Sequence, residues 1–107
     1  MANYVFIESR DPFESRDTGF LEATVLAVKD RGHDVTMFLV QNGVLATRKN
    51  AQCLGRLVDA GVNLLADDLS LQERGIKTNE LAPGIRQAGI DELVDRIAQK
   101  NTKAIWH

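Results

Sequence analysis

The sequence contains a single cysteine, Cys53, only two histidines and no long apolar run. One cysteine excludes an intramolecular disulfide and a zinc site made of several cysteines. The histidines, His33 and His107, are too few and too scattered to indicate a metal centre, so we expect neither a metal nor another cofactor. No stretch approaches the roughly 18 apolar residues of a membrane-spanning helix.

Charge of neither sign dominates the chain. There are 13 basic and 15 acidic residues, which gives a formal net charge of -2. The charges are mixed along the sequence and form no basic stripe, which argues against nucleic-acid binding. The first residues do not combine a basic region with a long apolar one, so we expect no signal peptide and a cytoplasmic protein.

Short runs of β-forming residues alternate with segments of helical spacing. The pattern predicts strands at 4–8, 35–40, 62–65 and 103–106, and a very short strand around Ile85. It predicts helices from Asp17 or Thr18 to Arg31, from Ala51 to Asp59, from Asp67 or Asp68 to Gly75, and after a cap at Asp91. Alternating strands and helices indicate right-handed crossovers.

This order predicts one domain over residues 1–107, a three-layer α/β/α fold with a mostly parallel sheet of about five strands and a flavodoxin-like appearance. Ligands of such sheets bind beyond the carboxyl ends of the strands, where the strand order reverses. The candidate binding residues at those ends are Ser9, Arg10, Asn42, Gly43, Asp67, Asp68 and Ser70.

These residues allow more than one role. Arg10 offers a fork of donors and Gly43 permits close backbone approach, which suits a small anion, although ordinary polar loops are the alternative. Asp67 and Asp68 either share a proton or supply a base, or simply cap the following helix. Ser70 and Glu73 have the spacing of a capping box.

Cys53 is the one possible sulfur nucleophile. A reactive thiol needs a lowered pKa, and Cys53 falls in an early turn of its predicted helix, near Arg48, Lys49 and Arg56. The alternative is a packed thiol beside Leu57.

Three further residues carry expectations about surface and mobility. Phe13 and Trp106 are candidates for a subunit contact, and core packing under the last helix is the alternative for Trp106. We expect His107 to be mobile.

Three segments together carry a family resemblance. They are Lys29–Val35 with its Gly-His pair, Phe38–Val44, and Leu57–Leu64, which is followed by Arg74-Gly75-Ile76. In this order they resemble the DsrE/DsrF/DsrH-like family, which includes the Tus sulfur-relay proteins. The resemblance spans Tyr4 to Trp106.

The resemblance implies a function, but this sequence departs from the family's pattern at the position of the reactive cysteine. DsrE-type and TusD-type members place a reactive cysteine at the end of the third strand, and that position falls on Asp67, with Ser70 the other candidate. The acidic segment before Arg74-Gly75 looks closer to the DsrH/TusB flavour. A carboxylate cannot form a persulfide, so the resemblance implies a non-catalytic, partner-binding subunit of intracellular sulfur relay, of the sulfur-oxidation or tRNA-thiolation type.

Such a subunit would form homo-oligomers, or hetero-oligomers with cysteine-bearing DsrE-family relatives, usually dimers to hexamers. Two alternatives stay open. One is a sulfurtransferase that uses Cys53 as its persulfide carrier. The other is a small-molecule or anion-binding regulatory domain without sulfur chemistry, because a fold does not fix a function.

Overall fold

A five-stranded sheet forms the centre of the computed structural model, which describes residues 2–107. Its strands are β1 (Asn3–Glu8), β2 (Asp34–Leu39), β3 (Asn63–Asp67), β4 (Ile85–Ala88) and β5 (Thr102–Trp106). They lie in the order β4-β3-β2-β1-β5, and every neighbouring pair is parallel. The predicted α/β fold is therefore confirmed, and the sheet is parallel throughout.

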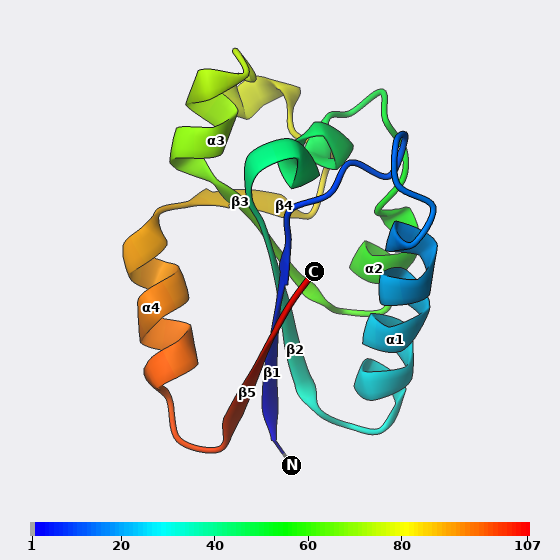
Figure 1. Ribbon diagram of the computed structural model, residues 1–107, viewed down its shortest axis with the longest axis vertical. Coiled ribbons are helices and arrows are strands. Elements are labelled where there is room, and N and C mark those ends of the chain that lie inside the picture. The colour runs from blue at the N-terminus through cyan, green and yellow to red at the C-terminus, as the bar shows by residue number, and fades with distance from the viewer. Residues whose placement is uncertain (1) are drawn as a thin grey trace.

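Helices cover both faces of this sheet (Figure 1). The helices α1 (Thr18–Asp30) and α2 (Gly55–Asp59) lie on one face, and α4 (Ile90–Ala98) lies on the other. The short α3 (Asp68–Glu73) and the 3-10 helices η1 (Gln41–Thr47) and η2 (Thr78–Glu80) lie beyond the carboxyl edge. Within residues 2–107 no helix has the length and apolar character needed to cross a membrane.

Alternating side chains divide the core into two layers. Phe6, Met37, Leu39, Leu57 and Leu64 belong to the larger cluster, on the side of α1 and α2. The smaller cluster, on the side of α4, contains Val5, Ile7, Phe38, Leu65 and Leu93 as well as Val40 and Ala88. Because β2 is buried on both faces, its sequence is apolar almost throughout, as in other parallel sheets.

Two helix starts and one helix cap differ from the prediction. The helix expected from Ala51 begins only at Gly55, because Gln52 adopts a left-handed φ of 54° and the chain turns there. Asp17 precedes α1 but its side chain makes no capping bond, since it is held by other partners. The last helix begins at Ile90 after Gly89, which places Asp91 in the first turn instead of at the cap.

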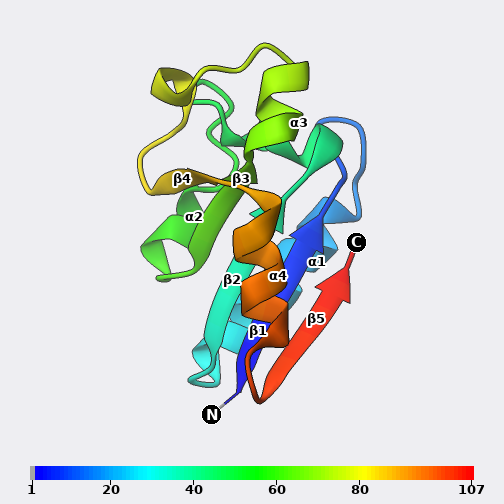
Figure 2. The same ribbon diagram turned by 90° about the vertical axis from the view of Figure 1, so that its left-hand side faces the viewer.

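The strand order reverses between β1 and β5. From β1 the chain adds β2, β3 and β4 in turn on one side, and then returns to place β5 on the other side of β1. Figure 2 shows β5 at this edge, beside α4 and not beneath it. The carboxyl ends of β1 and β5, at Glu8 and Trp106, therefore flank the position at which parallel sheets most often bind ligands.

Candidate functional site

Asp67, the last residue of β3, caps the helix α3. Its Oδ2 accepts the Ser70 backbone N–H at 3.0 Å and the Ser70 hydroxyl at 2.6 Å. The same Ser70 hydroxyl accepts the Gln41 backbone N–H at 2.8 Å. Both side chains are buried, and Gln41 holds a left-handed φ of 50°. The carboxylate is therefore used in joining β3, α3 and η1, which supports the capping interpretation of Asp67.

The other residues of this crevice also have partners within the chain. Ser70 lies inside α3 and bonds back to Asp67, so the capping box expected with Glu73 is wrong. Arg74 donates two hydrogen bonds, from Nε to Asn42 Oδ1 at 3.2 Å and from Nη1 to the Ser70 carbonyl oxygen. Arg74 therefore brings Asn42 close to Ser70. Asp68 is exposed and lies toward Gly89 at the start of α4, away from the crevice.

Gly43 lies against the backbone of β1. A Cβ built on it would stand 2.3 Å from the Glu8 carbonyl oxygen, closer than real Cβ atoms come. That same oxygen accepts the Val40 backbone N–H at 3.0 Å. The close approach predicted for Gly43 is therefore present, and it is made to the protein's own backbone.

Ser9 and Arg10 follow β1 at the strand-order reversal, and the Ser9 Cα lies 3.6 Å from a Cβ built on Gly43. The Ser9 hydroxyl donates to the His107 carbonyl oxygen at 3.0 Å. The Arg10 guanidinium forms an ion pair with Asp17, a carboxylate whose pKa is lowered chiefly by the Ser15 hydroxyl and further by Arg10. Arg10 therefore already has an anionic partner.

A histidine and two carboxylates meet at the same place. His107 Nδ1 lies 2.9 and 3.0 Å from the two Glu8 oxygens, and its Nε2 lies 3.3 Å from Asp17 Oδ2. Glu8 is only 4% exposed and also accepts the Arg10 backbone N–H at 3.0 Å. The His107 ring lies between the carboxylate that ends β1 and the carboxylate that precedes α1, which argues against the expected mobility of His107. In residues 2–107 no group of three or more histidine, cysteine or acidic side chains, this cluster included, is arranged to hold a metal ion.

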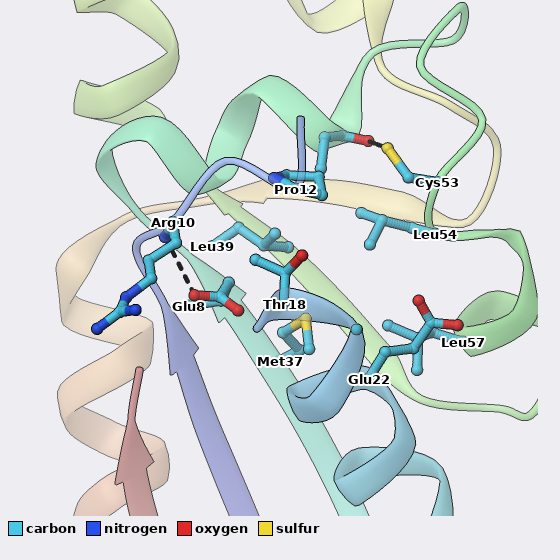
Figure 3. Close-up of a pocket in the computed structure, with 12 residues that line it drawn as sticks. Glu8, Arg10, Pro12, Thr18, Glu22, Met37, Leu39, Cys53, Leu54 and Leu57 are labelled. Atoms are coloured by element: carbon cyan, nitrogen blue, oxygen red, sulfur yellow. Dashed lines mark hydrogen bonds between the residues drawn. The ribbon is translucent and has the colours of Figure 1, made fainter. Parts of the chain in front are cut away.

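A small pocket adjoins this cluster on the α1 side of the sheet (Figure 3). Its volume is about 80 Å³, and most of its wall is apolar, with Met37, Leu39, Leu54 and Leu57 among the lining residues. Glu8 and Cys53 lie at different ends of it, as Figure 3 shows. Sequence reasoning missed Glu8, although a carboxylate that closes a buried strand was a usable signal.

Cys53 lines this pocket as a half-buried thiol. It precedes α2 instead of lying in its first turn, so the predicted position within the helix is wrong. Its Sγ lies 3.7 Å from the Ala46 carbonyl oxygen, to which only a protonated thiol donates. Burial raises the pKa of Cys53, and the Coulombic effect of Arg48 only partly offsets it. At neutral pH Cys53 is therefore a thiol and a poor nucleophile.

The comparisons with known proteins agree on one fold. The chain superposes over its full length on all of a protein of unknown function, MTH1491, from Methanobacterium thermoautotrophicum, with a TM-score of 0.84 at 19% identity. It superposes equally completely on the ychN protein from E. coli, with a TM-score of 0.87 at 18% identity. No curated protein matches the sequence. The model of the DsrE/DsrF-like family matches residues 2–103, and the chain therefore belongs to the DsrE/DsrF-like family.

Proposed function

We propose that this chain is a partner-binding subunit of intracellular sulfur relay that carries no sulfur itself. The observation that carries the proposal is the cap formed by Asp67 and Ser70 at the end of β3. The resemblance places the family's reactive cysteine at this point. Here the carboxylate accepts two hydrogen bonds and cannot form a persulfide. The same proposal places the chain nearer to the DsrH/TusB flavour of the family.

The state of Cys53 supports this proposal over a sulfurtransferase. A persulfide carrier attacks as a thiolate, and its site lowers the thiol pKa with a helix N-terminus or a nearby cation. Cys53 instead has a raised pKa, mainly because of its burial, and donates to the Ala46 carbonyl.

An exposed apolar surface offers a place for the partner. The side chains of Ile90, Val94 and Ile97 recur at helical spacing along α4 and are 57%, 57% and 40% exposed. Trp106, 64% exposed, pairs in register with Ile7, whose side chain belongs to the cluster beneath α4. Core packing of Trp106 is thereby excluded. The proposed partner is another copy of this chain or a cysteine-bearing DsrE-family relative, and apolar aromatic surface is common at such interfaces.

Two measurements test the two halves of the proposal. In the first, the purified chain is incubated with a persulfide donor and its intact mass is recorded, with a cysteine-bearing relative as the positive control. We expect no sulfur adduct on this chain. An adduct that disappears in Cys53→Ser would favour the sulfurtransferase instead.

In the second measurement, the chain is analysed by light scattering alone and after mixing with the cysteine-bearing relative. We expect a self-associated or mixed assembly that dissociates in Val94→Asp. Glu73→Gln, which changes an exposed side chain on α3, serves as the control and should leave the assembly intact. A monomer under both conditions would contradict the partner-binding role.

A further inference from the structure

The pocket beside Cys53 is lined by more acidic than basic charge. Glu8 and Glu22 both line it, and the one cation among its lining residues is Arg10, which is paired with Asp17. Outside the pocket, His107 contacts Glu8, and Arg56 lies 3.6 Å from Glu22 with a side chain that is 80% exposed. Among the lining residues, the formal negative charge therefore exceeds the positive charge by one.

The backbone offers little to an anion here. Although Thr18 and Gly19 line the pocket at the start of α1, a helix terminus that could favour anions, their amides are already used. The Thr18 N–H donates to the Ser15 carbonyl at 3.3 Å, and the Gly19 N–H donates to the Arg16 carbonyl at 3.1 Å. Burial is the main cause of the raised pKa of Cys53, and Asp11 and Glu22 add to the rise while Arg48 opposes it.

Glu8 can still accept another hydrogen bond. An ionised carboxylate has about four acceptor positions. Arg10 N–H occupies one on Oε1, and the single Nδ1 of His107 lies between the two oxygens. In Figure 3 the second Glu8 oxygen is directed toward Thr18 and Met37, on the side of the pocket.

The size and the walls of the cavity limit its ligand. A volume of about 80 Å³ accommodates about five to eight non-hydrogen atoms at roughly 10–15 Å³ for each atom-sized probe. Away from Glu8, Arg10 and Glu22, most of the wall is formed by apolar side chains such as Met37, Leu39 and Leu57. These apolar side chains suit a short hydrocarbon chain.

We propose that this pocket binds a small primary ammonium ion with a short alkyl chain, the ammonium group donating to Glu8 and the chain packing against Met37, Leu39 and Leu57. The charge-assisted hydrogen bond to a buried carboxylate supplies the selectivity. Burial of the hydrocarbon supplies the remainder of the affinity. The proposal does not depend on a role in sulfur relay, so either one can fail without the other.

Three ligands of similar size test it: n-butylammonium, n-butanol and butyrate, each titrated into the intact protein at constant ionic strength. Backbone amide signals of the pocket residues are followed by NMR. We expect saturable binding of butylammonium, at least tenfold tighter than butanol, because a hydrogen bond to a charged group contributes about this factor. Butyrate should show no saturable binding. Equal affinities for the three ligands, tighter binding of butyrate, or no binding at all would overturn the proposal.

Two variants locate the site. Glu8→Gln should weaken the binding of butylammonium about tenfold and leave the affinity for butanol unchanged. The distant control Glu73→Gln should change neither affinity. Gly19→Leu places a larger side chain where a Cβ meets no atom within 4 Å, so it should narrow the pocket mouth without harming the fold. It should weaken both butylammonium and butanol, and unchanged binding in Gly19→Leu would place the ligand elsewhere. If Glu8→Gln does not fold, the ligand series and Gly19→Leu decide the question.

Discussion

Gly43→Ala should destabilise the protein strongly, although it adds one methyl group. The new Cβ would lie 2.3 Å from the Glu8 carbonyl oxygen and 3.1 Å from its carbon. Real Cβ atoms essentially never come within 3.0 Å, so the 2.3 Å separation must open by 0.7 Å between two backbone segments. Neither segment is a flexible side chain that could move aside.

That displacement would strain two hydrogen bonds at the start of η1, one to β1 and one within the first turn. The Val40 N–H donates to the Glu8 carbonyl at 3.0 Å, and the Gly43 N–H donates to the Val40 carbonyl at 2.9 Å. Overpacking costs about 1–3 kcal/mol and a weakened hydrogen bond about 1 kcal/mol, so we expect a loss of about 2–4 kcal/mol. For a chain of this length the melting temperature should fall by about 10–20 °C.

Chemical and thermal unfolding measured by circular dichroism would record this loss. Gly19→Ala is the matched control, because it is the same substitution in α1 at a site where the added Cβ meets no atom within 4 Å. Alanine favours a helix more than glycine does, so the control should be unchanged or slightly stabilised. A Gly43→Ala protein as stable as the wild type would refute the close packing of η1 on β1.

Three further predictions concern side chains. Ser70→Ala removes the acceptor of the Gln41 N–H and a donor to Asp67, and it should lower the free energy of unfolding by about 1–3 kcal/mol. Thr24→Ala, which loses only a bond to the Phe20 carbonyl of its own helix, should be nearly neutral; equal losses would contradict the role of Ser70. Arg86, and to a lesser extent Arg96, lowers the pKa of Glu92 from 4.5 to about 2. The ionised Glu92 carboxylate therefore stabilises the fold above pH 4.5, and this contribution is lost as the pH falls toward 2. Carboxyl NMR should show this titration, and Glu92→Gln should flatten the stability profile in that window; a midpoint near 4.5 would count against the ion pair. At pH 8 iodoacetamide should alkylate Cys53 more slowly than it alkylates the thiol of free glutathione, since burial raises the pKa of Cys53. Faster alkylation of Cys53 would mean an activated thiol.

Local sequence patterns predicted most of the fold. The apolar run Val35–Leu39 forms the doubly covered β2, because burial on both faces leaves no position for polar side chains. Gly32, Gly61 and Gly75 follow their helices with φ values of 86°, 85° and 66°, the left-handed conformation that ends a helix. Asp67 was recognised as a possible cap because a carboxylate at the start of a helix can accept its free backbone N–H groups.

The segment 41–54 was beyond such patterns. Its apolar residues Val44 and Ala46 are buried in a 3-10 helix, whose period of three residues is too short to show in a helical or strand pattern. Two left-handed residues, Gln41 and Gln52, bend the chain without a glycine. No helix or strand was predicted between the strand at 35–40 and the helix from Ala51, so the 3-10 helix was not anticipated.

Part of the candidate site depends on contacts between residues distant in the sequence. Glu8 and His107 are 99 positions apart and meet only because β5 pairs with β1. No spacing rule relates them, so no local pattern joins them. The crevice residues Asn42, Asp67 and Ser70 lie near one another because they follow strands that are neighbours in the sheet.

The absence of a carrier thiol is tested most directly by intact-mass spectrometry after incubation with a persulfide donor. The account predicts that this chain keeps its mass, because the Asp67 carboxylate cannot form a persulfide and Cys53 stays protonated. The cysteine-bearing relative should gain sulfur in the same experiment. Gain of sulfur by the wild-type chain, lost in Cys53→Ser, would contradict the account.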